Sequence, residues 1–464
     1  MEPKLVFYAD DFTGATDALE FMAMAGARAI LFLDTPTADE IEEFEDLDVI
    51  GIAGKTRAMT PEQMKMTLER DFAAIAGINP SHIHYKVCST FDSSPEIGNI
   101  GVAINQGILH FKNSFVPIIV ASPDLGRYVI FGQLFAQMGI GTKGEVYRID
   151  KHPSMSTHPV TPAKEADLRD HLGLQADFKT GLIDIRDLEE SLPELFKKVQ
   201  QLSKDHEVIF FDGLYSPQLK KLGAILEHSK ASDKPLFSVG SSGVEQALAD
   251  FWQQESVLGK EPEWEIVDQV NPLLVLCGSV SPITAGQIDY ALENGFAEVA
   301  IDPNFLKERL QDTVNHYTEQ VLKYMELGKS VVVHTARGPN DPRRTEMNAI
   351  TQKLGWNVIE SKSELPKRFG ELLGETAKAV AQKQPIKRLI IAGGDTSSYT
   401  ARALGIHAVQ MIAPQIKGAP LCRVYAKDSP VDGIQINLKG GQLGEKDYFV
   451  TLQKGSLNKN NKQQ

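Results

Sequence analysis

Two adjacent carboxylates, Asp10 and Asp11, follow the apolar run 4–9 and precede Thr13-Gly14 and a segment with helical spacing. Carboxylates at the end of a strand can bind sugar hydroxyls, hold a metal-bound phosphate, or take a proton from an attacking hydroxyl group. The same side chains are also good helix caps. The residues alone leave the catalytic and the capping interpretations open.

A single arginine, Arg57, follows the apolar run 48–53, within Gly54-Lys55-Thr56-Arg57. A P-loop needs a further glycine separated by four residues from its Gly-Lys-[Ser/Thr], and neither Gly54 nor Gly328 has one. We therefore reject both P-loop interpretations. Arg57 in a loop after a strand could still bind a carboxylate through its two-pronged guanidinium group, although a solvated surface arginine is the simpler alternative.

A third polar loop follows the run 82–87 and contains Lys86, Ser89, Thr90 and Asp92. We expect a helix to begin near Pro95, and the N–H groups and dipole at a helix N-terminus favour an anion. Cys88 lies in the same loop, but the motif offers no histidine partner. A packed thiol is the interpretation we favour for it.

Three glycine-containing loops follow apolar runs in the second half of the chain: 278–281, 393–396 and 439–444. Small residues before a helix let a phosphate approach the backbone. The pair Gly393-Gly394 is the strongest signal, because two glycines cost folding entropy and indicate a close approach. Asp395 could assist magnesium or orient a nucleophile. Capped turns, and a hairpin turn at 439–444, are the plainer alternatives.

Short apolar runs alternate with longer amphipathic segments along the chain, which predicts parallel sheets covered by helices. The expected strands are 4–9, 27–33, 48–53, 82–87, 116–121, 207–211, 273–278, 297–302, 330–335 and 387–394, and the clearest helical segments are 61–76 and 187–203. The polar loops then lie at the carboxyl ends of strands, where α/β proteins bind ligands.

A polar, proline-bracketed stretch at 253–272 predicts a linker. We therefore expect an α/β fold of two domains, 1–255 and 265–455, each with a mostly parallel sheet flanked by helices. We expect the active site in a cleft between them, where ligand sites are common, and a flexible polar tail at 456–464.

The chain has 464 residues and a net charge of −13, which argues against a nucleic-acid surface. No stretch approaches the roughly 18 apolar residues of a membrane span. The start of the sequence lacks the apolar run of a signal peptide, and three scattered cysteines fit a reducing compartment. These features predict a cytoplasmic protein, and they leave self-association into a homodimer open.

Taken in order, these motifs resemble the four-carbon acid sugar kinase family over nearly the whole chain. DDFTGATD, the Arg57 loop, YKVCSTFDSS, HPSMSTHPVTP (152–162) and GSSG (240–243) are similar to its sugar-binding half. GSVSPIT, IAGGDT and KGGQLG are similar to its nucleotide-binding half. Many relatives have GSCS and KSGNFG at the first and last of these, and this chain keeps glycines for backbone approach in both loops.

The resemblance implies a kinase that transfers a phosphoryl group from ATP, with Mg²⁺, to a small sugar acid such as threonate, erythronate, 3-oxo-tetronate or a branched oxo-acid. It implies a substrate site formed by Asp10, Asp11, Arg57, Lys86, Ser89 and Thr90, in which we expect Arg57 and Lys86 to bind the substrate carboxylate. It implies nucleotide contacts from Ser279, Ser281, Gly393, Gly394, Asp395, Thr396, Gly440, Gly441 and Gly444. Asp11 and Asp395 are the candidates for the general base, and the residues that hold the metal stay unassigned.

Two other functions differ from this one in what they need. A non-catalytic protein that binds sugar acids would keep the first-half motifs and could lose 393–395, which are present. An NAD-dependent oxidoreductase would need G-x-G-x-x-G after the first strand, where the chain has DDFTGA. The kinase is therefore the function we expect.

Overall fold

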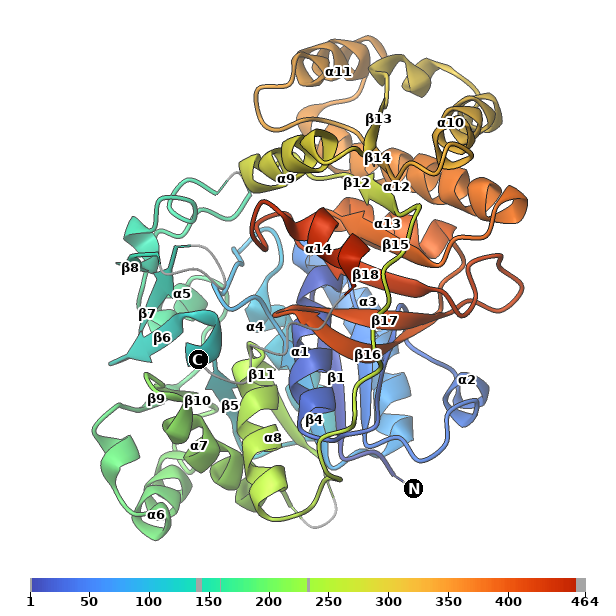
Figure 1. Cartoon of the computed structure of the whole chain (residues 1–464). Coiled ribbons are helices and arrows are strands. Elements are labelled where there is room, and N and C mark those ends of the chain that lie inside the picture. Colours follow the sequence, from blue (N-terminus) through green and yellow to red (C-terminus); the bar gives the residue numbers. More distant parts are fainter. Residues whose placement is uncertain (1, 139–143, 159, 232–233, 456–464) are drawn as a thin grey trace. The chain divides into compact units, whose positions relative to one another are not determined.

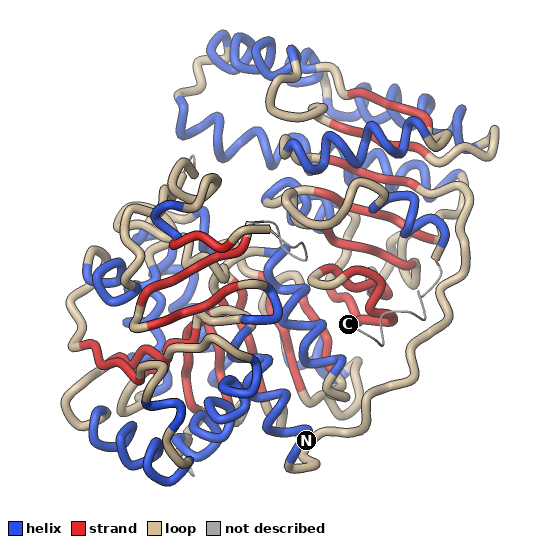
Figure 2. Tube along the Cα trace, turned by 60° about the vertical axis from the view of Figure 1, so that its left-hand side comes forward, coloured by secondary structure: helices blue, strands red, loops and turns tan. Residues whose placement is uncertain are grey.

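The computed structural model describes residues 2–138, 144–158, 160–231 and 234–455. The expected tail at 456–464 lies outside the described residues. The chain folds into two compact units, Met1–Pro262 and Glu263–Gln464. Both are α/β, as the alternation of apolar runs and amphipathic segments predicts, and Figures 1 and 2 show strands with helices alongside them in each unit.

The first unit is built on a parallel sheet whose strands run in the order β2-β3-β1-β4-β11-β5-β10-β9. Its strands are β1 (Leu5–Ala9), β2 (Ala29–Phe32), β3 (Val49–Ala53), β4 (His82–Lys86), β5 (Val116–Ile119), β9 (Thr180–Ile183), β10 (Val208–Phe211) and β11 (Leu236–Gly240). The central strands are buried along their whole length. β1 and β3 are continuous apolar runs, as burial on both faces favours, whereas β4 buries two histidines and a lysine.

Helices cover both faces of this sheet. They are α1 (Phe12–Met24), α2 (Ala38–Glu42), α3 (Pro61–Ile78), α4 (Ile100–Phe111), α5 (Leu168–Gly173), α6 (Leu192–Leu202), α7 (Ser216–Ser229) and α8 (Gly243–Gln254). Alternation along β4 shows the two layers: Tyr85 meets Phe72 of α3, whereas His84 and Lys86 point to α8 and α1. Figure 1 shows α1 and α8 side by side on that second face.

A small antiparallel sheet that the sequence did not predict lies in the same unit, with the order β6 (Arg127–Ile130), β7 (Gln133–Gln137) and β8 (Val146–Arg148). One further expectation is wrong. The helix expected near Pro95 begins at Ile100, with Asn99 as its cap. The Ser94 hydroxyl accepts the N–H groups of Glu96 and Ile97, and this turn replaces the first helical turn expected there.

The second unit has the strand order β13-β14-β12-β15-β18-β17-β16. Its strands are β12 (Leu274–Cys277), β13 (Ala297–Ala300), β14 (Val331–His334), β15 (Arg388–Ala392), β16 (Ala408–Ile416), β17 (Ala419–Tyr425) and β18 (Gln435–Lys439). The pairs from β13 to β18 are parallel, and β16 and β17 add an antiparallel edge that the sequence did not predict.

Helices again lie on both faces of the second sheet: α9 (Pro282–Glu293), α10 (Leu310–Met325), α11 (Pro342–Lys353), α12 (Val358–Lys383), α13 (Asp395–Ala403) and α14 (Tyr448–Lys454). Val275 and Ile390 pack in one apolar cluster with residues of α9 and α14. Side chains alternate along a strand, so Leu274 and Leu276 face the other layer. None of the helices within the described ranges is long and apolar enough to cross a membrane.

Candidate active site

The polar residues of the first unit meet because three neighbouring strands end together. Ala9 at the end of β1 pairs with Ala53 of β3 on one side and with Lys86 of β4 on the other. Parallel strands place their carboxyl ends at one edge of the sheet. Asp10, Asp11, Arg57 and Lys86 therefore form one cluster although Arg57 and Lys86 are distant from the aspartates in sequence, as the resemblance implies.

Arg57 is the centre of this cluster and is already paired. Its Nε and Nη2 donate to the two Asp10 carboxylate oxygens at 3.0 and 2.6 Å, and Nη1 lies 2.8 Å from Asp11 Oδ2. Burial raises the pKa of Asp10 to about 6, against the opposing effect of Arg57. Burial would lower the pKa of Arg57, but the two carboxylates outweigh it and raise that pKa. The pair is bidentate and rigid.

Asp11 is a helix cap, as one of the two interpretations predicts, and its catalytic role stays a prediction. It is the N-cap of α1, and its Oδ1 accepts the N–H of Gly14 at 2.9 Å. It also contacts Arg57, and 16% of its side chain is exposed against 4% for Asp10. A side chain on Gly14 would come within 2.4 Å of Asp11 Oδ1 and 2.7 Å of the Lys86 ammonium. That glycine lets the lysine approach the start of the helix.

Lys86 is buried and paired with Asp17 of α1. Its Nζ lies 3.0 Å from Asp17 Oδ1, and Ser242, from the GSSG segment, donates to Asp17 Oδ2 at 3.2 Å. Burial would lower the pKa of Lys86, but Asp17 and then Asp11 outweigh it and raise that pKa. Asp17 was not among the site residues expected from the sequence, although it is the last residue of DDFTGATD.

The loop after β4 is ordered by its own hydroxyl groups. Thr90 donates to Asp92 Oδ1 at 2.8 Å, and Ser89 is buried. Burial raises the pKa of Cys88 to about 11. Cys88 is therefore a protonated thiol at neutral pH, in keeping with the packed-thiol interpretation.

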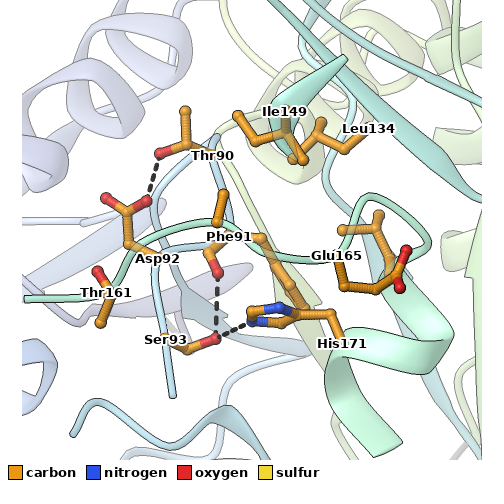
Figure 3. A pocket seen from close by; sticks show the side chains of 11 residues that line it. Thr90, Phe91, Asp92, Ser93, Leu134, Ile149, Thr161, Glu165 and His171 are labelled. Carbon is orange, nitrogen blue, oxygen red and sulfur yellow. Dashed lines mark hydrogen bonds between the residues drawn. The ribbon is translucent and has the colours of Figure 1, made fainter. Parts of the chain in front are cut away.

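A narrow pocket opens beside this loop (Figure 3). Thr90, Asp92 and Ser93 line one side, and Leu134 of β7, Glu165 and His171 of α5 the other. His171 Nε2 lies 2.9 Å from the Ser93 hydroxyl, which in turn donates to the Phe91 carbonyl. Its free volume of about 10 Å³ is room for about one water molecule. The pocket as it stands does not accommodate a sugar acid.

The glycine loops of the second unit also meet at one edge. The strands β12, β15 and β18 are neighbours, and the Gly278 and Gly393 N–H groups bond to the carbonyls of Ala392 and Lys439. A side chain on Gly441 would come within 2.8 Å of Ser279 Oγ. The three loops predicted to bind nucleotide therefore form one continuous surface.

Gly393 has φ +155°, a conformation that favours glycine, and it is buried. Gly394 is exposed and has φ −89°; a Cβ there would meet no atom within 4 Å. Gly394 is the N-cap of α13 and makes no side-chain cap, so the helix start is open to a ligand. Ser281, by contrast, caps α9, and Ser279 Oγ accepts the Ser281 N–H at 3.2 Å.

A buried lysine that the sequence did not place in the site holds the last of these loops. Lys439 is 0% exposed, and its Nζ donates to Thr284 Oγ1 at 3.1 Å and to the Gly440 carbonyl at 2.8 Å. Thr284 donates to the Gly441 carbonyl, and Gln287 to the carbonyls of 443–445.

These contacts gather the loop's carbonyl groups toward the protein. The backbone N–H groups of Gly440, Gly441 and Gly444 have no protein acceptor within the described residues. Such groups are the donors that phosphates use. Burial lowers the pKa of Lys439 to about 8.

The residues fit magnesium in one specific way. In the described part of the chain, no group of three or more His, Cys, Asp or Glu side chains could hold a metal ion by itself. Mg²⁺ usually keeps waters and takes one or two carboxylates together with substrate phosphates. Asp395, exposed in the first turn of α13 beside Gly393 and Gly394, suits that arrangement.

Two α/β units, one with a carboxylate–arginine–lysine cluster and one with a glycine-lined anion surface, are typical of a two-domain phosphotransferase. Comparison with known proteins agrees. Residues 5–248 match the model of a sugar-binding N-terminal domain, and residues 274–449 that of a nucleotide-binding C-terminal domain. The chain belongs to the four-carbon acid sugar kinase family and is an enzyme of the kinase class.

Curated relatives carry kinase names. A 3-oxo-isoapionate kinase from Paraburkholderia graminis is 36% identical, over 98% of this chain and 94% of its own length. A 3-oxo-tetronate kinase from Pseudomonas savastanoi pv. phaseolicola is 28% identical, over 97% and 96%. One from Cupriavidus necator is 26% identical, over 96% of each. The comparisons give no support to the non-catalytic alternative.

Solved structures agree with the fold alone. A Salmonella typhimurium protein described as a putative tRNA synthase has a TM-score of 0.77 at 22% identity, covering 98% of this chain and 99% of its own. A Haemophilus influenzae protein of a domain family of unknown function has a TM-score of 0.70 at 22% identity, covering 97% and 99%.

Proposed function

We propose that the protein transfers the γ-phosphoryl group of ATP to a hydroxyl group of a small, four-carbon-like sugar acid in carbohydrate catabolism. The candidate acids are threonate, erythronate, 3-oxo-tetronate and branched oxo-acids. The observation that carries the proposal is 36% identity, over nearly the whole of both chains, to a 3-oxo-isoapionate kinase. The proposal is also supported by the position of the predicted residues, which lie at the ends of neighbouring strands in each unit. A branched 3-oxo acid is therefore the first substrate to test.

In this proposal the acid binds at the ends of β1, β3 and β4. Asp10, held by Arg57, orients the hydroxyl groups, and Asp11 is the general base, because it is the more exposed of the two carboxylates. Lys86, Ser89 and Thr90 complete the contacts. Asp395 stays the second candidate for the base.

ATP would bind on the other unit, with its phosphates on the Gly393–Thr396 helix start and the Gly440–Gly444 loop. Ser279 and Ser281 line the same surface. Mg²⁺ would be held by the phosphates and Asp395, and it supplies neutralisation of charge on the transferred group.

The reaction is an in-line displacement. The substrate hydroxyl oxygen forms a bond to the γ-phosphorus, the bond from that phosphorus to the β,γ-bridging oxygen breaks, and the hydroxyl proton passes to the carboxylate base. ADP leaves with the bridging oxygen. Most of the rate comes from positioning and charge neutralisation. The interdomain cleft that would bring the two substrates together stays a prediction.

Because ATP is the phosphoryl donor and the three cysteines are free, we place the enzyme in the cytoplasm.

The test is a panel of C4 and C5 acids, with 3-oxo-isoapionate, 3-oxo-tetronate, threonate and erythronate among them, assayed for ATP-dependent ADP release. Each product is identified by ³¹P NMR and mass spectrometry. We expect one acid to exceed the others in kcat/KM by at least tenfold. ADP release that is the same with and without every acid would refute a sugar-acid kinase.

A further inference from the structure

The cations expected to bind the acid's carboxylate are already matched by protein carboxylates. Arg57 is paired with Asp10 and Asp11, and Lys86 with Asp17. Two positive and three negative groups leave this cluster with a formal charge of −1. A cluster of that charge suits hydroxyl groups, because carboxylates accept their hydrogen bonds. A net negative cluster does not attract the substrate's carboxylate.

Arg127, at the start of β6, is the contrasting case. Its residue is 6% exposed, and within the described residues it makes no ion pair. Nη1 donates to the carbonyls of Leu125, Gly126 and Gln137 at 3.1–3.2 Å. Nε is buried with no partner, and no described residue accepts from Nη2. A buried guanidinium without a carboxylate costs folding free energy unless a ligand supplies the anion.

A second unpartnered donor lies beside it. Ser122 and Arg127 pair directly, each backbone N–H bonding to the other's carbonyl at 3.0–3.1 Å. Side chains of directly paired residues lie on the same face. The Ser122 hydroxyl is 0% exposed and has no partner. Two buried donors therefore lie next to each other with no acceptor in the described chain.

The backbone register turns this face toward the substrate loop. Arg127 pairs with Ala136 of β7, so its side chain lies on the face that also holds Leu134, two residues along. Leu134 lines the pocket with Thr90 and Asp92 (Figure 3). Burial lowers the pKa of Arg127, and the groups that oppose this effect, Cys88 and Asp92, belong to the same loop.

We propose that Arg127, with the Ser122 hydroxyl, binds the carboxylate group of the sugar acid. This inference rests on the proposed function. The acid's charged end would then contact β6 beside the Cys88–Asp92 loop, and its hydroxyl groups would face Asp10 and Asp11. The site would select small acids over neutral sugars of the same length.

The test compares each acid with its neutral primary amide, using threonate, erythronate and any acid turned over in the panel. The ratio of kcat/KM for acid to that for amide measures recognition of the negative charge. In Arg127→Gln this ratio should fall about 10- to 100-fold, the effect of losing a charge-assisted pair, while KM for ATP stays within about twofold. A purely structural arginine would weaken acid and amide equally and leave the ratio unchanged.

The matched control is Arg148→Gln, on β8 of the same small sheet, whose side chain is 47% exposed and paired with Asp150; its ratio should equal that of the wild type. If Arg127→Gln does not fold, Arg127→Lys replaces it. The lysine keeps the positive charge but cannot bind a carboxylate through two parallel N–H groups, so KM for the acid should rise at least about fivefold. An unchanged acid-to-amide ratio in folded Arg127→Gln, or an unchanged KM for the acid in Arg127→Lys, overturns the assignment and leaves the kinase function standing. A wild-type enzyme that turns over no acid refutes the proposed function instead.

Discussion

Replacing Lys439 with methionine separates loop positioning from stability. Methionine keeps the unbranched apolar stem and removes the ammonium that holds Thr284 and the Gly440 carbonyl. The pKa of the lysine falls from 10.5 to about 8. At about 1.4 kcal/mol per pKa unit, burying the charge costs about 3 kcal/mol. The two hydrogen bonds contribute about 1.5–3 kcal/mol each. The variant should therefore lose between about 0 and 3 kcal/mol of unfolding free energy and stay folded.

Nucleotide binding should change much more than stability. Without the ammonium, the Gly440 carbonyl loses its donor, and the loop N–H groups that we expect to bind the phosphates should lose their order. Each lost phosphate contact weakens binding by about tenfold or more. We therefore expect KM for ATP to rise at least tenfold, with KM for the acid within about twofold. Steady-state kinetics with each substrate varied in turn, beside thermal unfolding, measures both quantities.

The charge of Lys439 adds a second readout. Because its pKa is about 8, the wild-type KM for ATP should rise as pH increases through 8, whereas the methionine variant should show no such rise. Lys446→Met is the matched control. Lys446 is exposed and contacts the Tyr290 ring. It should leave KM for ATP unchanged. A folded Lys439→Met protein with wild-type KM for ATP would refute the positioning role.

Three further outcomes are expected. Asp11→Asn, which caps α1 nearly as well as aspartate, should lower kcat/KM for the acid roughly a hundredfold with ATP affinity within about twofold; near-normal turnover would reduce Asp11 to a cap. Gly394→Val should fold, because a Cβ there meets open space, yet should abolish ATP binding in calorimetry, and normal affinity would remove the α13 start from the site. Below pH about 6, kcat/KM for the acid should fall as Asp10 takes a proton and releases Arg57, and an equal fall in Asp10→Asn would assign it elsewhere.

The acid limb of that profile is distinguishable from unfolding. The folded pKa of Asp10, about 6, lies above its ordinary value of 3.8. The folded chain therefore holds the proton more tightly, and the stability from this group is complete below about pH 3.8 and is lost as pH rises through 6. Protonating Asp10 should lower activity without lowering the melting temperature. A parallel fall of both between pH 7 and 5.5 would contradict this account.

The sequence predicted most strands of the parallel core, the clearest of which are continuous apolar runs such as VIGIA at Val49–Ala53. Three parallel strands, β9, β11 and β18, were not predicted. The sequence also missed the elements whose patterns are mixed. In β6 and β7 half-buried and buried residues alternate over four or five positions. Pro414 and Pro420 lie within β16 and β17, and a proline inside an apolar run argues against a strand.

Motif order was enough to place Asp10, Asp11, Arg57 and Lys86 together, since all follow strands of one parallel sheet. It could not show how their charges are used. The Arg57 guanidinium uses its N–H groups to pair with both Asp10 and Asp11. This pairing depends on side-chain geometry between residues 47 positions apart in the sequence. A solitary arginine in a strand-end loop suggested a carboxylate-binding group. In the structure it is paired with two protein carboxylates, and its contact with a substrate stays a prediction.

Arg127 and Lys439 were missed for the opposite reason, because neither lies beside an acidic motif. Both are buried, and neither makes an ion pair within the described residues. A protein that only needed these positions filled would gain by apolar side chains, since a buried unpaired charge is strongly destabilising. Lys439 offsets that cost with loop carbonyls and a threonine hydroxyl, whereas Arg127 leaves its Nε without an acceptor. This difference makes Lys439 a positioning residue for the nucleotide loop and Arg127 the group that an anionic substrate completes.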